Sequence, residues 1–356
     1  MPSTETIFLT GFPGFIAGRL VRRLATDGAR FLLLVQPALL ERARSEIARL
    51  SSGTGVSVDA FQLLEGDITR TELGLSPADL AAARAATTIL FHLAAIYDLG
   101  VARDSAMRVN VEGTRRVNEF ARTLKRLRRY NYVSTCYVAG LRTGVIYERE
   151  LRHAAGFRNY YEETKYLAEL EVEALKEHLP LTIYRPSVVC GDSLTGETAK
   201  YDGIYYLINY LLMQPRLLSL ANIGNGEVRL NLVPVDFVVE AMSALADDAR
   251  ADGLTLQLAD PAPLTTHELF ELISRSLTAR GSRFTLPAPL VRTSLKWRIS
   301  ESLTGLPRVG APYFFLKQTY DTTQAQQLLA PHGLRPPPFP TYVNNLINFV
   351  KQHPKL

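Results

Sequence analysis

The sequence contains only two cysteines, Cys136 and Cys190, in 356 residues. Two cysteines cannot build a disulfide framework, and they suit a reducing compartment. The N-terminus has no basic segment followed by a long apolar one, so it does not resemble a secretory signal. The longest apolar stretch, residues 203–220, is interrupted by polar residues and a proline and is too polar for a membrane span. We therefore expect a cytoplasmic protein.

Signals for several functional classes are also absent. The six histidines show no metal-ligand spacing, so we predict no metal site, and no G-x-S-x-G elbow indicates a hydrolase. The net charge of +5 is spread along the chain, and its densest basic run, at 124–130, falls where a helix should end. No zinc-finger spacing accompanies that run. We therefore expect no nucleic-acid partner.

Strands and helices alternate regularly through the first 190 residues. The apolar runs between the helical patterns are unbroken, as in strands that are buried on both faces. Such alternation predicts an α/β protein with a doubly wound parallel sheet of the Rossmann type. The expected strands lie at 5–10, 31–36, 61–66, 87–95, 130–135 and 181–189. Residues 228–242 predict one more strand and helix, which should return to the sheet.

A glycine-rich turn, TGFPGFIAGRL, directly follows the first expected strand and opens the first helix. Gly11 permits a tight turn, and Gly14 lets the backbone approach a pyrophosphate at the helix N-terminus. The third position of the pattern is Ala17, which is tolerated because that site governs helix–strand packing. The alternative is a glycine turn without a ligand. Its place between a strand and a helix favours dinucleotide binding.

The choice of cofactor depends on the end of the second strand. An acidic residue there would bind the ribose hydroxyls of NAD and repel a 2′-phosphate. This chain has Gln36 at that point, with Arg42 and Arg44 nearby and Arg19 in the glycine-rich segment. We therefore expect NADP(H) to be favoured over NAD(H).

Two adjacent tyrosines stand at the start of an expected helix in residues 156–169, GFRNYYEETKYLAE. Lys165 follows Tyr161 by four residues, a spacing that puts both side chains on one face. Tyr160 has no such partner, so we assign it to packing or to the substrate pocket. A phenol has a pKa near 10, and an ammonium about 4 Å away would lower it by roughly 3 units. Thr135, at the end of a strand, adds a hydroxyl for a developing oxyanion.

Several motifs occur together in a characteristic order. They are T-G-x-x-G-x-x-[GA] at 10–17, GDI at 66–68, HLAA at 92–95, VNVEGT at 109–114, VSTCYVAG at 133–140, Tyr161-x-x-x-Lys165 and RPS at 185–187. This order resembles the extended short-chain dehydrogenase/reductase superfamily. The segments VSTCYVAG, YRPSVVCGDSLTGE and NLVPVDFVV are most similar to the branch of fatty acyl-CoA reductases, thioester reductases and the reductase domains of carboxylic acid reductases.

The resemblance implies roles for individual residues. Tyr161 would be the proton donor, Lys165 its electrostatic partner and Thr135 the hydroxyl that holds the substrate carbonyl. Asn110 matches a helix position that supports the lysine. The cofactor-binding residues implied by the resemblance are Gly11, Phe12, Pro13, Gly14, Phe15, Ile16, Gln36, Asp67, Ile68, Leu93, Ala94, Ala95, Tyr161, Lys165, Pro186, Ser187 and Val188.

Two domains are expected from these patterns and from the chain length. Residues 1–190 and 229–260 would form the NAD(P)-binding Rossmann domain. Residues 191–228 and 261–356 would form a smaller, mostly helical substrate lobe. In that lobe, residues 205–220 could face an acyl chain, form a core helix, or lie as an amphipathic face against lipid, so peripheral membrane contact stays open. The sequence carries no signal for an oligomeric state.

The leading functional hypothesis is an NADPH-dependent reductase that converts a small-molecule or carrier-bound acyl thioester, on CoA or an acyl-carrier protein, into an aldehyde or alcohol. One alternative is a ketone or nucleotide-sugar dehydrogenase or epimerase of the same superfamily. A second is a binding protein that senses NADP(H) without catalysis. The presence of Thr135, Tyr161 and Lys165 together favours an enzyme.

Overall fold

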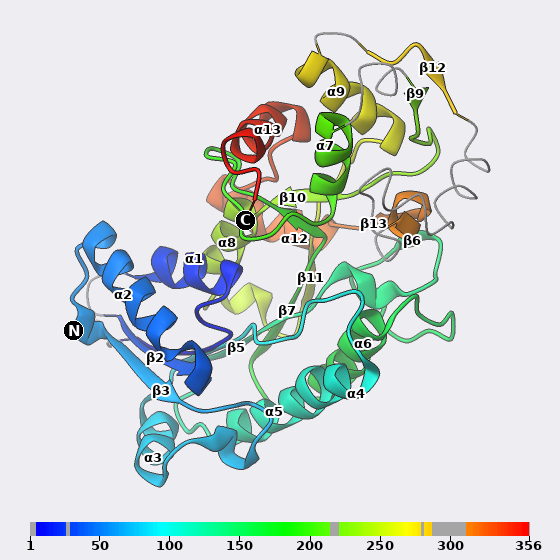
Figure 1. The fold of residues 1–356 in the computed structure, drawn as a ribbon. Helices are drawn as coiled ribbons and strands as arrows, with labels where there is room; N and C mark the ends of the chain where they lie inside the picture. Colours follow the sequence, from blue (N-terminus) through cyan, green and yellow to red (C-terminus); the bar gives the residue numbers. More distant parts are fainter. Residues whose placement is uncertain (1–4, 26–28, 214–220, 279–280, 287–310, 356) are drawn as a thin grey trace.

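The structure is a computed structural model that describes residues 5–25, 29–213, 221–278, 281–286 and 311–355. Figure 1 shows a large sheet with helices on both faces and a second group of helices beside it. The sheet has seven parallel strands in the order β11-β7-β5-β4-β1-β2-β3. Its strands are β1 (Thr6–Thr10), β2 (Arg30–Val35), β3 (Phe61–Glu65), β4 (Ile89–His92), β5 (Arg129–Val133), β7 (Leu181–Pro186) and β11 (Thr255–Leu258). The predicted Rossmann-type fold class is confirmed.

Alternate side chains of the strands enter two separate cores, as the two-residue period of a strand requires. Ile7 and Leu9 face one core, whereas Phe8 between them faces the other. The first core is covered by α1 (Phe15–Leu24), α2 (Leu40–Thr54), α8 (Val235–Ala244) and α12 (Thr323–Leu329). The second is covered by α3 (Pro77–Ala86), α5 (Thr114–Arg122) and α6 (Tyr160–Glu173). Both faces of the sheet are therefore buried.

The strand expected at 181–189 is divided in two. β7 ends at Pro186, and β8 (Val188–Cys190) leaves the sheet to pair with β10 (Leu232–Pro234). The expectation that the strand within 228–242 joins the main sheet is therefore wrong. β11 takes that place, because Ser187 donates its backbone N–H to Leu258 while the next residue bonds to Asn231. The helix of this segment, α8, does return to the sheet and packs on α1.

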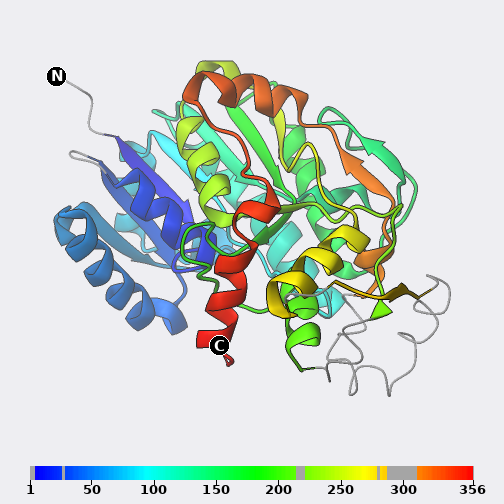
Figure 2. The ribbon, with the colours of Figure 1, turned by 90° about the horizontal axis from the view of Figure 1, so that it is seen from above.

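A third apolar cluster lies in the second group of helices, α7 (Ile204–Met213), α9 (Thr266–Thr278) and α13 (Val343–Gln352). These helices lie together on one side of the molecule in Figure 2. α7 buries Ile204, Leu207 and Ile208 in this cluster, which favours the core-helix interpretation for its residues. The rest of the predicted acyl or lipid surface, 214–220, lies outside the described residues. The division into two domains stays a prediction.

The remaining elements are short. α4 (Arg103–Ala106) runs into a π-helical segment at Met107–Gly113, and β6 (Gly144–Ile146) pairs with β13 (Gln318–Tyr320). β9 (Ala221–Asn222) pairs with β12 (Phe284–Thr285). Within the described ranges, no helix has the length and apolar character needed to cross a membrane.

Candidate active site

The glycine-rich turn between β1 and α1 leaves room for an anion. Gly11 adopts φ +96, and a Cβ atom there would lie 2.9 Å from the backbone nitrogen of Ala94. A Cβ atom on Gly14 would lie 2.7 Å from the carbonyl oxygen of Gly11. Gly14 is also the N-cap of α1 and provides no side-chain cap, and the first turn contains no acidic residue. The Gly14 N–H is bonded to the Gly11 carbonyl at 2.8 Å, so the N–H groups available to a phosphate are those at the start of α1 that follow Gly14.

A cavity of about 650 Å³ extends from this turn along the carboxyl ends of the strands. It lies beside β1 and β4, where the strand order reverses and ligands of such folds bind. Thr135 and every predicted cofactor residue except Pro13 line it. Asn110 does not. The structure thus gathers residues that are far apart in the sequence into one wall, whereas their individual roles stay predictions.

Tyr161 belongs to the cavity wall and Tyr160 does not. Tyr161 is 6% exposed, whereas the neighbouring Tyr160 is 45% exposed and lies on the surface. Burial raises the pKa of the Tyr161 phenol above its ordinary value, and a hydrogen bond with Thr135 acts in the opposite direction. The Thr135 hydroxyl also accepts the backbone N–H of Tyr137, which fixes its position. The phenol is therefore protonated at neutral pH, as a proton donor must be.

Lys165 corrects the expectation from the sequence. It shares the helical face of Tyr161, but its ammonium donates to the Val133 carbonyl at 2.8 Å and to the Tyr132 hydroxyl at 3.1 Å. It also lies 4.7 Å from the centre of the Tyr132 ring. Burial lowers the pKa of Lys165 to about 8, and the charge of Glu169 opposes this shift. The predicted fall of the Tyr161 pKa is wrong for this structure, because desolvation dominates.

Asn110 acts on the site indirectly. Its side-chain oxygen accepts the backbone N–H of Ile96 at 2.8 Å, and its amide donates to the Thr164 hydroxyl at 3.0 Å. Ile96 lines the cavity, and Thr164 precedes Lys165 on α6. Asn110 lies in the π-helical segment, a local geometry that is frequent at functional sites. Asn110 therefore connects the loop that lines the cavity to α6, and its role in supporting Lys165 stays a prediction.

A buried ion pair lies beneath the lysine. Arg185 on β7 donates to the Glu169 carboxylate at 2.7 Å, and neither residue is more than 1% exposed. The Ser134 hydroxyl also donates to Glu169, and Arg185 donates to the carbonyl of Glu150 at 2.9 Å. Glu169 follows Lys165 by one helical turn. The pair thus keeps a compensated negative charge close to the lysine in the interior.

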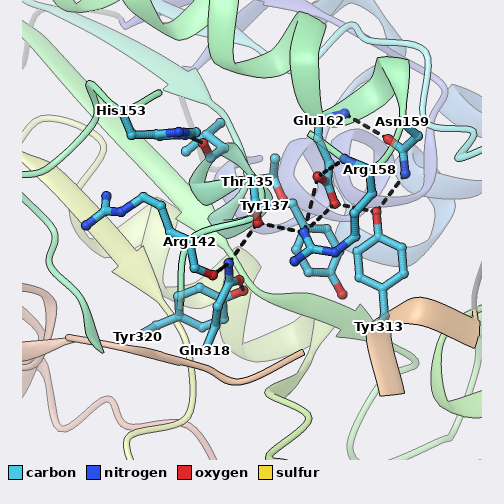
Figure 3. A network of polar contacts seen from close by, with 12 residues as sticks. Thr135, Tyr137, Arg142, His153, Arg158, Asn159, Glu162, Tyr313, Gln318 and Tyr320 are labelled. Atoms are coloured by element: carbon cyan, nitrogen blue, oxygen red, sulfur yellow. Dashed lines mark hydrogen bonds and ion pairs between the residues drawn. The ribbon is translucent and has the colours of Figure 1, made fainter. Parts of the chain in front are cut away.

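The start of α6 is tied to the C-terminal part of the chain by the contacts in Figure 3. Glu162, next to Tyr161, is fully buried and accepts the Tyr313 hydroxyl at 2.6 Å. Asn159, which caps α6 by accepting the N–H of Glu162, donates to the same hydroxyl at 2.8 Å. Arg158 donates to Glu162 at 3.1 Å. These contacts fix the helical turn that carries Tyr161.

At the end of the cavity where we expect the nucleotide part of the cofactor, some of the predicted residues line the wall and others do not. Gln36 lines the cavity, and its amide donates to the Asp67 carboxylate at 3.3 Å. Of the three arginines named from the sequence, Arg19 pairs with Asp192 at 3.0 Å, and none contributes to the cavity wall. At the other end, the buried Ser187 hydroxyl has no partner among the described residues. The open turn at Gly14 and this free hydroxyl fit a bound dinucleotide.

Sequence reasoning missed part of the wall near Tyr161. Tyr97 packs edge-on against Tyr161 with ring centres 5.1 Å apart, and Lys200 and Asp202 come from the loop before α7. Tyr137 also lines the cavity. The available signals were weak: Tyr97 follows the HLAA motif, and Tyr137 lies inside VSTCYVAG. Neither motif specifies which way these side chains point.

The family comparison decides the class of the protein. A family model described as Male sterility protein (NAD_binding_4) matches residues 9–242. This chain belongs to that family. The resemblance to NAD(P)-dependent reductases of the extended short-chain dehydrogenase/reductase type, predicted from the sequence, is confirmed. The family's NAD(P)-binding domain thus coincides with the residues that form the main cavity.

Curated relatives in this family share about a quarter of their residues with the chain. The glycine betaine reductase ATRR of Emericella nidulans is 25% identical, over 76% of this chain and 22% of that protein. Fatty acyl-CoA reductase wat of Drosophila melanogaster is 24% identical, over 68% and 54%. A carboxylic acid reductase of Segniliparus rugosus is 26% identical, over 71% and 24%. The chain therefore spans between about a fifth and about half of these relatives.

Solved structures agree on the fold. The terminal R domain of the myxalamid PKS-NRPS pathway has a TM-score of 0.81 at 24% identity, covering 100% of this chain and 92% of that one. A thiolation-reductase di-domain from an archaeal non-ribosomal peptide synthetase has a TM-score of 0.76 at 16% identity, covering 98% and 76%. At these identities the likeness establishes the fold alone.

Proposed function

We propose that this chain is an NADPH-dependent reductase of acyl thioesters that releases an aldehyde, or an alcohol after a second reduction. One observation carries the proposal. Thr135 and Tyr161 line the same cavity, the Thr135 hydroxyl lowers the pKa of the Tyr161 phenol, and the glycine-rich turn at Gly11 and Gly14 lines the cavity as well. A substrate carbonyl at the two hydroxyls would thus lie beside the dinucleotide.

The residues of the site suit this chemistry. Bound NADPH would supply a hydride to the carbonyl carbon of the thioester. The Tyr161 hydroxyl would give its proton to the resulting oxyanion, and Thr135 would hold that oxygen by a hydrogen bond. When the carbon–sulfur bond breaks, the carbonyl re-forms, its proton returns to Tyr161, and the departing thiolate takes a proton from solvent. The net reaction consumes one hydride and one proton and yields an aldehyde and a thiol.

Lys165 supports the proton transfer through its charge. The ammonium lies in the same buried wall, so it stabilises the phenolate that Tyr161 becomes after it gives up its proton. Its hydrogen bond to Val133 fixes it at the end of β5, next to Thr135. No cysteine is needed. Cys136 is 1% exposed, and burial raises the pKa of its thiol, so it is unsuited to nucleophilic attack.

The substrate class is supported by the names of the relatives. They reduce fatty acyl-CoA, carboxylic acids or glycine betaine according to those names, and one structural neighbour joins a thiolation domain to its reductase. A CoA or carrier-protein thioester is the substrate form that suits this set best. The chain is shorter than these relatives, so the assignment to thioesters remains our proposal.

A screen of cofactor oxidation tests the function. Purified protein with NADPH would be offered acyl-CoA thioesters, aldehydes, ketones and UDP-sugars, and absorbance at 340 nm would be followed. We expect turnover of thioesters and aldehydes. Tyr161→Phe should bind NADPH normally and lose at least about a hundredfold in kcat, whereas the surface variant Tyr160→Phe should behave as wild type. Turnover of UDP-sugars alone, or an active Tyr161→Phe variant, would refute the proposal.

The preference for NADPH rests on Gln36, which stands where an acidic residue would repel a 2′-phosphate. Gln36→Asp would place a second carboxylate beside Asp67. We expect KM for NADPH to rise by about tenfold or more while KM for NADH changes little or falls. An unchanged ratio of the two KM values would show that Gln36 does not select the cofactor.

A further inference from the structure

A second, smaller cavity adjoins the main one beside Tyr161. It has a volume of about 60 Å³. The two cavities share Tyr97, Tyr137, Val188, Lys200 and Asp202 in their walls. A group bound in the small cavity would therefore be continuous with a carbonyl held at Tyr161. At about 10–15 Å³ for each water-sized group, this space fits a group of about five heavy atoms and excludes a long acyl chain.

Five of the twelve residues that line the small cavity carry aromatic rings. Tyr97 stands edge-on to Tyr161, and Tyr137 lies against Tyr313 with ring centres 4.5 Å apart. Tyr206 and Phe314 complete the aromatic part of the wall. Aromatic faces carry a negative electrostatic potential, so several rings around a small space attract a cation.

Two carboxylates add to this potential. Asp98 and Asp202 both line the small cavity, and the side chain of Asp202 is 17% exposed. Burial raises the pKa of Asp202, so its carboxylate gains from a nearby positive charge. Burial raises the pKa of Tyr206, which lines the same cavity, and the negative charges of Asp202 and Asp98 raise it further.

The cationic residue in the wall, Lys200, already marks the position of a positive charge. Its ammonium lies 5.6 Å from the centre of the Tyr97 ring and 3.9 Å from the Asp202 carboxylate. The Lys200 side chain is 59% exposed, so it can turn toward solvent. The charge on a substrate can therefore take the place of the ammonium over Tyr97.

We propose that the small cavity binds a cationic group on the acyl part of the substrate. The proposal rests on the proposed function and narrows its substrate to small thioesters that carry an ammonium or quaternary ammonium on the carbon next to the carbonyl. The short separation is required because Tyr97, whose ring lines the small cavity, touches the ring of Tyr161. The rings and the two carboxylates would hold the cation, and Tyr161 would act on the adjacent carbonyl.

The first test needs no variant. The trimethylammonioacetyl and 3,3-dimethylbutanoyl thioesters of CoA have the same shape and differ only in charge, as do glycyl- and propanoyl-CoA. We expect kcat/KM to be at least about tenfold higher for the charged member of each pair. Equal or higher values for the neutral members would overturn the cationic site and leave the thioester reductase intact.

Binding without turnover separates the two proposals. Titration calorimetry would compare choline with 3,3-dimethyl-1-butanol, its neutral isostere, on the NADPH-bound protein. Tighter binding of choline, together with no reduction of any thioester, would sustain the cationic site and refute the proposed function. If the two ligands bind equally, the cationic site is wrong.

Variants of the lining residues test which of them interact with the charge on the substrate. Asp202→Asn should reduce the preference for the charged thioester by about tenfold, whereas Lys200→Met should increase it, because it removes the competing ammonium. Asp104→Asn is the control, since this exposed residue of α4 lines neither cavity. Tyr206→Phe should keep the preference and Tyr206→Leu should weaken it. If Asp202→Asn and Asp104→Asn give the same preference as wild type, Asp202 does not bind the cation and the assignment fails.

Discussion

The pH dependence of the reaction tests how Tyr161 and Lys165 divide the proton chemistry. Burial raises the pKa of Tyr161 above its ordinary value and lowers that of Lys165 to about 8. Tyr161 therefore stays protonated over the working range, while Lys165 loses its charge as the pH rises through about 8. Because the ammonium stabilises the phenolate, we expect kcat/KM to be level below pH 7 and to fall with unit slope above about pH 8.

The size of the effect follows from the helix. The Cβ atoms of residues four apart on a helix lie about 6 Å from each other. Taking that spacing for the two charges, an effective dielectric of about 20 gives a contribution of roughly 3 kcal/mol. That energy corresponds to about a hundredfold in rate. Lys165→Met should therefore lower the plateau by about a hundredfold and abolish the alkaline fall. Lys165→Arg should also abolish the fall, because a guanidinium keeps its charge throughout the range.

Steady-state NADPH oxidation between pH 6 and 10, at constant ionic strength, measures these profiles. Lys176→Met is a matched control. Lys176 follows α6, donates to the Thr255 hydroxyl at 2.7 Å and lines no part of the main cavity, although burial lowers its pKa too. This variant should keep the wild-type profile. If the alkaline fall survives in Lys165→Met, another group titrates and the role given to Lys165 is wrong.

Two further predictions concern the glycine turn and the buried ion pair. Gly11→Ala should abolish NADPH binding, because its Cβ atom would meet the backbone of Ala94. Gly55 also has a positive φ but open space around it, so Gly55→Ala should lose only about 1–2 kcal/mol of stability and keep its NADPH affinity. Fluorescence titration with NADPH distinguishes the two variants. Arg185→Met should lower the free energy of unfolding by about 3–5 kcal/mol, because it leaves Glu169 buried and unpaired. In urea denaturation, the double variant Arg185→Met with Glu169→Leu should recover part of the lost free energy of unfolding. A free energy of unfolding lower than that of Arg185→Met alone would contradict this account.

Much of the main cavity could be predicted from the sequence, because the carboxyl ends of parallel strands meet at one edge of the sheet. Gly11 and Gly14 follow β1, the HLAA motif begins at the last residue of β4, and Thr135 lies just beyond β5. Once the strands are recognised, these residues must converge. The four-residue spacing of Tyr161 and Lys165 likewise predicts that both side chains lie on one face of the helix.

The remaining features depend on contacts that the chain order does not specify. The four-residue spacing could not show that Val133 and Tyr132 bind the ammonium of Lys165, or that desolvation outweighs its charge at Tyr161. The pairing of β8 with β10 was missed because a short apolar run does not identify its partner strand. Tyr97 lies in a loop, where side-chain direction follows from packing and not from periodicity.

The hydrogen bonds of Tyr313 link two segments that are synthesised far apart in time. Glu162 lies 151 residues before Tyr313, and its carboxylate accepts from the guanidinium and backbone N–H of Arg158 and from the Tyr313 hydroxyl. A fragment that ends before the Tyr313 segment would leave a carboxylate beside Tyr161 without one of its donors. Chimeras that exchange the C-terminal third between relatives must therefore carry both ends of this contact, or we expect them to assemble the sheet and still misplace Tyr161.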